Sequence, residues 1–386
     1  MENVPDTLVQ PIARPEELQP LLEAIHSTPE VYIDTEADSL HHYFEKVCLF
    51  QFTVGTNGSY ATFLVDPLAK FDLKPLIDAM RDKLLVFHGA DYDLKLLRDG
   101  YEFTPREIFD TMLAARLAGH SGLGLDALVQ KYIGKELDHG AQKADWSQRP
   151  LPARLLKYAV EDTAHLPEIT GKLRGELNAL GRSEWHRQQC AQLVKLTAAP
   201  RERSEDDLWR IKGSFDLDRQ SLAILRELWK WRDQEARDWD RPSFMVCNND
   251  KLLKWTFWAL DHGPDNLGAI PDIPPRWRRK RYDNLCAAFQ RAWNVPPEEH
   301  PEKPARGKRP PFDPKFSPRL NRIKEIRNEK AKALALDPSI LAANWMLEAI
   351  ASRAPKTIDE LNETERWLPW QTELMGKEFV AALAAT

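Results

Sequence analysis

Hydrophobic and polar positions follow different patterns in the two halves of the chain. In the first half, four short runs rich in β-branched and aromatic residues have the length of strands: VYIDTE (31–36), VCLFQFTV (47–54), SYATFLVD (59–66) and LLVFHG (84–89). GTNG at 55–58 is typical of a hairpin turn, so the second and third runs are expected to be antiparallel neighbours. The fourth run is expected to lie beside the first.

From about residue 105 the pattern becomes helical. The helical runs are REIFDTMLAARLAG (106–119), GLGLDALVQKYIG (122–134) and PARLLKYAVEDTAHLPEITGKLRGELNAL (152–180). Gly119, Gly134 and Pro152 mark their boundaries, as glycine and proline commonly do at helix ends. Strands and helices together predict an α/β domain over residues 1–180, with a mixed sheet flanked by helices.

The second half has tryptophan, arginine and leucine at helical spacing and no strand pattern. It predicts a helical connector (181–213) and two helical bundles (214–292 and 318–386), separated by a proline-rich charged linker (293–317). Trp229, Trp231, Trp255 and Trp258 are expected in the core of the first bundle. RELWKWRDQEARDWDRP and KEIRNEKAKALALDP share a basic amphipathic pattern that ends in Asp before Pro, which favours two copies of one module.

Length and composition indicate a multidomain protein and argue against several other classes. A chain of 386 residues is expected to form two or three domains. The net charge of -5 gives no overall footprint for nucleic acid, so such binding would depend on local basic patches and bound metal. The four cysteines lie far apart without a CxxC motif, which argues against a disulfide framework or a zinc site. With no signal-like or 18-residue apolar segment, we expect a cytoplasmic protein without membrane association.

Four acidic residues in three segments predict a metal site. Asp34 and Glu36 stand two apart on an expected strand, so they project from the same face while Thr35 points away. Asp93 is at the start of the helix expected after LLVFHG, and Asp162 is on a later helix. Mg²⁺ and Mn²⁺ prefer such oxygen ligands, and two of these ions about 3.5–4 Å apart can drive phosphodiester hydrolysis.

Tyr158 lies four residues before Asp162, so a helix places both side chains on one face. A tyrosine pKa near 10 makes deprotonation costly, so positioning of the attacking water is the expected role. By itself, Tyr158 would more often be an ordinary half-buried aromatic residue. Asp91 and Asp110 are expected to serve helix starts rather than the site.

IDTE, HGADYDLKLL and YAVED resemble the three motifs of the DEDDy exonucleases, and ADWSQRPLPARLLKYAVED resembles the corresponding stretch of ribonuclease D. The resemblance implies a ribonuclease H-like exonuclease fold followed by all-α HRDC domains, at 214–292 and, more weakly, at 318–386. It implies metal ligation by Asp34, Glu36, Asp93 and Asp162 and water positioning by Tyr158. It also implies 3′-to-5′ hydrolysis of RNA that releases 5′-phosphomonoesters, with tRNA 3′ ends as the typical substrate.

Several basic residues are candidate contacts for the substrate. His88, Lys143 and Arg149 lie near the motifs, and the last two flank Trp146. Farther along are RWRRKR (276–281) and the linker residues Lys303, Arg306, Lys308 and Arg309. A solvated charged surface is the alternative explanation for each of these runs.

Two other functions fit parts of the same pattern. The site could act on single-stranded DNA, or the chain could be a silent nucleic-acid-binding adaptor. The intact acids weigh against an adaptor, which has no need for clustered carboxylates that repel one another. GLGLDA (122–127) resembles a dinucleotide-binding motif, but it follows an expected helix rather than a strand, so we reject that interpretation.

Overall fold

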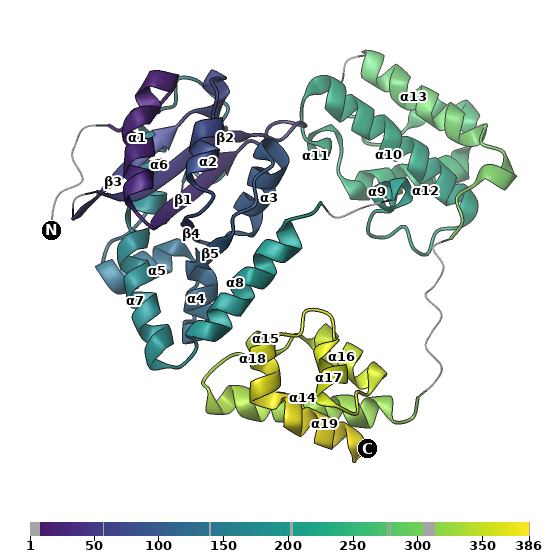
Figure 1. Ribbon diagram of the computed structural model, residues 1–386. Coiled ribbons are helices and arrows are strands. Elements are labelled where there is room, and N and C mark those ends of the chain that lie inside the picture. The colour runs from purple at the N-terminus through teal and green to yellow at the C-terminus, as the bar shows by residue number, and fades with distance from the viewer. Residues whose placement is uncertain are drawn as a thin grey trace. The chain divides into compact units, whose positions relative to one another are not determined.

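The computed structural model describes residues 8–56, 58–138, 140–200, 204–275, 277, 279–303 and 313–385. The chain, drawn in Figure 1, divides into two compact units. The first comprises Met1–Ala37, Val47–Pro200 and Phe312–Thr386, and the second Asp38–Lys46 and Arg201–Pro311, each as far as its residues are described. Five of the basic residues proposed as contacts lie outside the described residues: Arg276, Arg278, Arg306, Lys308 and Arg309.

A five-stranded mixed sheet forms the centre of the first unit, with strand order β3-β2-β1-β4-β5. The strands are β1 (Glu30–Ala37), β2 (Val47–Thr56), β3 (Ser59–Val65), β4 (Leu84–Phe87) and β5 (Glu107–Asp110). β2 pairs antiparallel with β1 and β3, whereas β4 pairs parallel with β1 and with β5. The predicted hairpin, and the predicted position of the fourth run beside the first, are confirmed.

The prediction of one helix over residues 106–119 is wrong at its start, where β5 forms instead. Ile108 packs into the core on one face of the sheet and Phe109 into the core on the other, which is the alternation of a strand. This signal lasts only four residues before an equally apolar helix, so the sequence pattern conceals it. Asp110 then caps that helix by accepting hydrogen bonds from the backbone nitrogens of Met112 and Leu113, which confirms its predicted role at a helix start.

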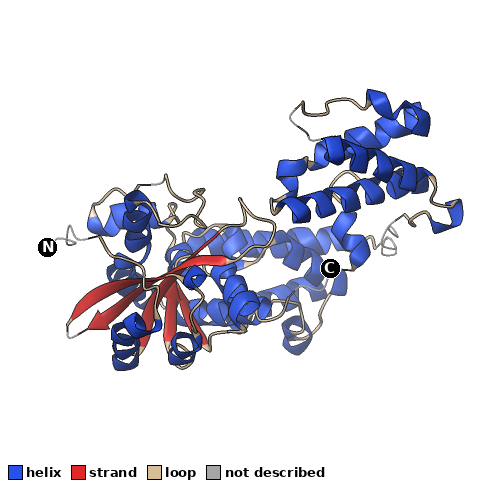
Figure 2. Cartoon of the chain, turned by 90° about the horizontal axis from the view of Figure 1, so that it is seen from above, coloured by secondary structure: helices blue, strands red, loops and turns tan. Residues whose placement is uncertain are grey.

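Helices cover both faces of the sheet (Figures 1 and 2). One layer contains α1 (Gln19–Ser27), α2 (Lys74–Ala79), α3 (Asp91–Tyr101) and α8 (Ser183–Thr197), and the other contains α4 (Thr111–Ala118), α5 (Leu125–Ile133), α6 (Ala153–Ala164) and α7 (Leu166–Ala179). Short 3-10 turns lie at Pro15–Leu18 and Pro67–Ala69. The GLGLDA segment follows helix α4, as its rejection as a dinucleotide motif requires.

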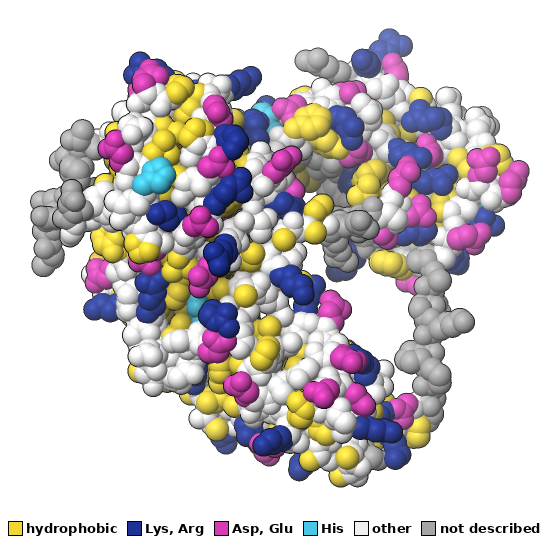
Figure 3. Space-filling model, viewed as in Figure 1, with side chains coloured by type: hydrophobic (Ala, Val, Ile, Leu, Met, Phe, Trp, Pro, Cys, Tyr) yellow, Lys and Arg dark blue, Asp and Glu magenta, His cyan; other side chains and the backbone are white. Residues whose placement is uncertain are grey.

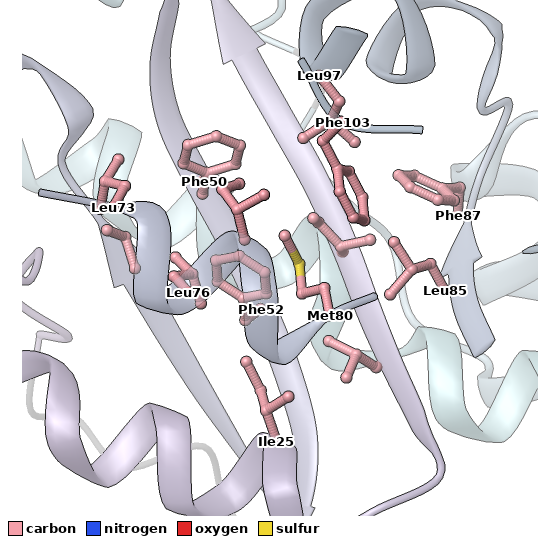
Figure 4. Packing of buried hydrophobic residues seen from close by; sticks show 14 of the residues in the cluster. Ile25, Phe50, Phe52, Leu73, Leu76, Met80, Leu85, Phe87, Leu97 and Phe103 are labelled. Atoms are coloured by element: carbon pink, nitrogen blue, oxygen red, sulfur yellow. The ribbon is translucent and has the colours of Figure 1, made fainter. Parts of the chain in front are cut away.

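Alternate residues of the strands fill the core under the first helical layer. Phe50 and Phe52 of β2 and Leu85 and Phe87 of β4 belong to one cluster with residues of α1, α2 and α3 (Figure 4). Because side chains alternate along a strand, Gln51 between the two phenylalanines points to the opposite face. The opposite face of the sheet therefore carries polar side chains at its centre.

The predicted helical run over residues 152–180 is two helices. α6 ends at Ala164 and α7 begins at Leu166, with Pro167 in its first turn, where the missing N–H costs no hydrogen bond. In the predicted connector, α8 places Cys190 in the core of the first unit, and His186 Nε2 lies 2.9 Å from the Asp110 carbonyl oxygen. α8 is therefore an integral layer of the first unit.

The described part of residues 204–303 forms a helical bundle. Its helices are α9 (Glu205–Trp209), α10 (Arg219–Trp239), α11 (Ser243–Val246), α12 (Asn249–His262) and α13 (Arg279–Trp293), with 3-10 turns at Pro264–Ala269 and Pro297–Glu299. Trp231 and Trp255 are buried in its hydrophobic cluster, as predicted, whereas Trp229 and Trp258 are half-buried and pack against that cluster.

Residues 38–46 follow β1 in sequence but pack with this bundle. His42 Nδ1 lies 2.7 Å from Asp240 Oδ2, and the Tyr43 hydroxyl donates to Asp233 Oδ1 at 2.8 Å. This loop therefore belongs to the second unit, although it lies inside the domain predicted over residues 1–180.

A second helical bundle, over residues 313–385, belongs to the first unit. Its helices are α14 (Phe316–Ala333), α15 (Pro338–Leu341), α16 (Asn344–Arg353), α17 (Ile358–Asn362), α18 (Pro369–Gln371) and α19 (Lys377–Ala384), with a π-helical turn at Thr372–Gly376. The ring of Trp185 in α8 stacks on that of Trp370 with centroids 4.5 Å apart. Arg182 donates to the Leu334 carbonyl oxygen at 2.8 Å, which ties the bundle to the helices of the sheet domain.

Acidic and basic side chains are intermixed on the face seen in Figure 3, in agreement with the small net charge.

Among the described residues, no helix is both long enough and apolar enough to span a bilayer. Cys48, Cys190, Cys247 and Cys286 are all free thiols.

The two bundles share a buried arginine in their long helices. Arg232 of α10 donates to a backbone carbonyl at 3.3 Å and to Asn249 Oδ1 at 2.8 Å. Arg327 of α14 donates to a backbone carbonyl at 2.9 Å and to Asn344 Oδ1 at 2.9 Å. The shared contact supports the predicted repeat of one module. When the two bundle sequences are aligned on these arginines, the asparagines also coincide, whereas the Asp and Pro residues at the ends of the two compared segments do not.

Replacing Arg327 with methionine should destabilise the C-terminal bundle, because a buried carbonyl and the Asn344 amide oxygen lose their donor. We expect the free energy of unfolding to fall by about 1–3 kcal/mol, measured by urea unfolding followed through tryptophan fluorescence. Arg322→Met is the control, since Arg322 is exposed on the same helix and pairs with Glu325. Equal effects of the two substitutions would contradict the anchoring role.

Candidate active site

β1 carries Asp34 and Glu36 beyond the point where its neighbour β4 stops pairing. The β1–β4 register runs only from Glu30 to Tyr32, whereas β1 continues to pair with β2 past Glu36. Asp34 faces the same side as its partner Gln51, because directly opposed residues of an antiparallel pair project together. Both acids therefore lie on the face that α6 covers, in the part of β1 that pairs with β2 but not with β4.

Helix α6 brings Asp162 to this pair. One carboxylate oxygen from each of Asp34, Glu36 and Asp162 lies within 4.8 Å of the others. All three side chains are half-buried, so the cluster is open on one side. A strand and a helix far apart in sequence thus place three oxygen ligands around one point.

Asp93 reaches the site from the first turn of α3. Its side chain is buried, and its Oδ1 accepts a hydrogen bond of 2.6 Å from the hydroxyl of Thr35. Thr35 points to the opposite face of the sheet from Asp34 and Glu36, as predicted. On that face its hydroxyl can reach the Asp93 carboxylate. Asp93 therefore lies beside the cluster of three rather than within it, but close enough to act on Asp34 electrostatically.

Burial raises the pKa of every one of these acids, and repulsion from neighbouring carboxylates adds to it, from Asp110 in the case of Asp93. Burial, followed by repulsion from Asp93 and Asp162, holds the pKa of Asp34 well above its ordinary value. Burial with the same two neighbours raises the pKa of Glu36 to about 9. Burial is also the main reason why the pKa of Asp162 rises to about 8 and that of Asp93 to about 7. Without a positive partner, the cluster holds protons at neutral pH.

The cluster fits divalent cations. Its donors are all carboxylate oxygens, the type that Mg²⁺ and Mn²⁺ prefer. Asp162 Oδ2 is buried and has no hydrogen-bond partner, so the protein leaves this ligand atom unsatisfied. An unpaired buried oxygen is costly, and a bound cation removes that cost.

Tyr158 lies one turn before Asp162 on α6, as predicted. Its ring packs against that of Trp146 with centroids 6.0 Å apart, and its hydroxyl interacts with the Gln142 side chain. Burial, then Asp162, Glu36 and Asp34, raise the pKa of Tyr158 above its ordinary value. The phenol therefore keeps its proton at neutral pH, which favours orientation of water over proton abstraction.

The expected substrate contact of Arg149 is corrected by its surroundings. Its guanidinium binds the carboxylate of Asp66 through two hydrogen bonds of 2.6 Å. It also donates to the carbonyl oxygens of Cys48, Trp146 and Gln148. A guanidinium has five N–H donors, and all of them are used here, so Arg149 anchors the loop before α6 and has no donor left for phosphate.

His88 and Lys143 have different surroundings. His88 Nδ1 lies 2.9 Å from the Thr111 hydroxyl, which itself donates to a backbone carbonyl, while Nε2 is buried without a partner. His88 is half-buried and one of its ring nitrogens is enclosed, whereas Lys143 is exposed in the loop before α6 and is the substrate candidate that we retain. Asp91 pairs with Lys95 on the surface of α3, as expected of a structural residue.

Sequence reasoning missed three polar residues of the site: Thr35 as the partner of Asp93, Gln142 beside Tyr158, and Gln51 beside Asp34. A signal for Gln51 was present, because it is an amide in the middle of the apolar run VCLFQFTV. Thr35 and Gln142 carry no comparable signal, since polar residues are common at a strand end and in a loop.

Comparison with known proteins identifies the family. A family model described as 3′-5′ exonuclease matches residues 9–178, and the HRDC domain model matches residues 221–288 and 317–383. Ribonuclease D of Pseudomonas paraeruginosa is 30% identical over 365 residues, covering 92% of this chain and 92% of that protein. The chain belongs to the ribonuclease D family.

Other members of the ribonuclease D family match over similar lengths. Ribonuclease D of Desulfotalea psychrophila is 28% identical, over 88% of this chain and 89% of that protein. The crystal structure of Escherichia coli RNase D, described as an exoribonuclease involved in structured RNA processing, has a TM-score of 0.72 at 24% identity and covers 98% of this chain and 99% of that one. At this identity the structure bears on the fold, and it confirms the predicted exonuclease domain followed by HRDC-like bundles.

For this site, the affinity for Mn²⁺ should rise with pH. The acids hold protons up to pKa values of about 7, 8 and 9, so binding must release protons at neutral pH. Because the folded state binds more protons than the unfolded state, the stability of the metal-free protein should fall as pH rises from the ordinary carboxyl pKa of about 4 toward these values. Calorimetric titration in buffers of different ionisation enthalpy measures the release, and thermal unfolding in EDTA measures the stability. Mn²⁺ binding without proton release would contradict the raised pKa values.

Proposed function

We propose that Asp34, Glu36, Asp93 and Asp162 hold two divalent cations, Mg²⁺ or Mn²⁺, and that tRNA precursors are among the substrates of this chain. The chain is a metal-dependent 3′-to-5′ exoribonuclease of the ribonuclease D family. The observation that carries the proposal is the set of three ligand oxygens within 4.8 Å of one another, with one buried oxygen left unpaired.

The residues of the site have distinct roles in the proposed mechanism. When bound, a cation pair activates water and offsets the charge that develops on the leaving oxygen. Asp34 and Glu36 on a strand and Asp162 on a helix hold their oxygens on rigid elements, so little reorganisation is needed. Tyr158 donates its O–H to orient the attacking water toward phosphorus. The water oxygen forms a bond to phosphorus as the bond to the 3′-oxygen of the preceding nucleotide breaks. The 3′-oxygen takes up a proton from solvent, and the terminal nucleotide leaves with a 5′-phosphate.

Basic side chains at two places are candidate contacts for RNA. Lys143 is exposed in the loop before α6, within the exonuclease part of the chain. In the second unit, Arg281 lies over the ring of Trp239 at 4.5 Å and pairs with Glu235, and Lys280 and Asp238 line the same cavity of about 340 Å³. Aromatic faces beside basic groups stack on bases and bind phosphates. We propose both as contacts for the RNA chain.

Hydrolysis of single-stranded DNA by the same site is the second candidate function. The cation ligands act on phosphate, which RNA and DNA share, and the distinction depends on the 2′-hydroxyl. Degradation rates of matched RNA and DNA oligomers compare the two substrates directly. A silent adaptor is disfavoured, because an unneeded cluster with raised pKa values would only destabilise the fold.

The purified protein should shorten a 5′-labelled single-stranded RNA from its 3′ end in Mg²⁺ or Mn²⁺ and leave it intact in EDTA. Asp34→Asn should lower the rate on the order of 10³-fold, because a cation ligand is lost. It should not lower the unfolding temperature, because the amide has nearly the same size and shape as the protonated carboxyl group that it replaces. Asp91→Asn is the matched control and should retain activity, since Asp91 pairs with Lys95 outside the site. Shortening by Asp34→Asn at the wild-type rate would refute the assignment of the site.

Tyr158→Phe should reduce kcat on the order of 10²-fold and leave the affinity for Mn²⁺ unchanged, because the phenol orients water and is not a cation ligand. The packing against Trp146 is retained in this variant. Single-turnover kinetics give the rate, and calorimetric titration gives the affinity. A loss of Mn²⁺ binding in Tyr158→Phe would mean that the hydroxyl belongs to the metal site instead.

A further inference from the structure

Gln51 is a buried amide for which the fold provides no partner. The residue is 0% exposed in the centre of β2, and both its Nε2 and its Oε1 are buried without a hydrogen-bond partner. Nearly all buried polar groups in proteins are hydrogen-bonded, so an amide with neither end paired requires an explanation. An apolar side chain of the same length would cost less in a metal-free core.

The position of Gln51 points to the metal site. In the β1–β2 register, Gln51 is directly opposite Asp34, and opposed side chains of an antiparallel pair project from the same face with Cβ atoms about 4.5–5.5 Å apart. The amide therefore lies beside a carboxylate that supplies a proposed cation ligand.

Helix α6 closes the space on the other side of Gln51. Two residues along β2, on the same face, the Thr53 hydroxyl lies 2.9 Å from the Thr163 hydroxyl of α6. Thr163 is the neighbour of Asp162, so the helix that packs over Gln51 is the one that carries another proposed ligand. Gln51 is thus enclosed between the two elements that form the site.

A carboxylate that gives one oxygen to a cation keeps a second oxygen, and proteins usually supply a hydrogen-bond donor to it. With a cation bound, the second oxygen of the Asp34 carboxylate is a strong acceptor. The unpaired Gln51 amide stands directly opposite Asp34 in the strand register.

We propose that Gln51 is a positioning residue that donates a hydrogen bond from Nε2 to the Asp34 carboxylate when divalent cations are bound. The contact fixes the direction of the Asp34 ligand oxygen and is made only in the loaded site. This inference rests on the proposed function of the site and adds a residue that the three sequence motifs do not include.

The test substitutes Gln51→Met, which keeps the length of the side chain and removes the donor. In the full chain, the unfolding temperature in EDTA should be equal to or higher than that of the wild type, because an unpaired amide is removed. The dissociation constant for Mn²⁺, measured by calorimetric titration, should rise by about 10- to 100-fold, the usual effect of losing a hydrogen bond to a metal ligand. The Mn²⁺ concentration that gives half-maximal hydrolysis should rise by the same factor.

Thr170→Val is the matched control. Thr170 is also 0% exposed, on α7, and its hydroxyl is likewise buried without a partner. Its removal should leave the Mn²⁺ affinity unchanged. Gln51→Leu provides a second variant with a smaller side chain if the methionine does not fit.

The outcomes separate the inference from the function on which it rests. Wild-type Mn²⁺ affinity in Gln51→Met and Gln51→Leu would overturn the positioning role. So would a large fall in their unfolding temperature in EDTA with unchanged Mn²⁺ affinity, because that pattern belongs to a structural residue. Absence of Mn²⁺ binding by the wild-type protein would instead refute the proposed metal site itself.

Discussion

Repulsion among buried carboxylates is the constraint on which the arrangement of the first unit depends. Asp34, Glu36 and Asp162 bring one carboxyl oxygen each within 4.8 Å of the others, and burial and the repulsion that ionisation would cause raise the pKa of each. Such a cluster lowers the stability of the metal-free fold, so the surrounding structure must hold the acids in place against their own repulsion. The divalent cations that this family requires reverse the sign of the interaction. The loss of folding free energy caused by the clustered acids is thus offset only when the cations are bound.

The surrounding structure meets this constraint with rigid elements and dedicated anchors. The core of phenylalanine and leucine under β1 and β2 fixes the strand that carries two of the acids. The Thr35 hydroxyl holds Asp93 from the far side of that strand. Arg149 uses all five of its donors to pin the loop that leads into α6, and α6 carries both Asp162 and Tyr158. Residues that contact no substrate therefore determine where the ligands stand.

The helical bundles are stabilised differently from the site, by apolar packing rather than by bound cations. Each is held by apolar packing around a long helix whose buried arginine reaches a backbone carbonyl and an asparagine. The first bundle carries more tryptophans, and one of its exposed rings, Trp239, lies under Arg281. The two copies therefore share the buried arginine but differ in the aromatic residues around it.

The sequence by itself predicted the fold class, two of the strand pairings, the four tryptophans of the first bundle and the five residues proposed for the site. These features follow from local periodicity and from motif spacing, which can be recognised in the sequence before any tertiary contact is known. Only the tertiary structure decided that residues 107–110 form a strand, that Arg149 is an anchor, and that residues 38–46 pack with the second unit. The same holds for Gln51, whose polarity was visible in its apolar run but whose neighbour Asp34 was not. The reason is physical: hydrogen-bond partners and strand register join residues far apart in the chain, and no local pattern records which distant group will stand opposite.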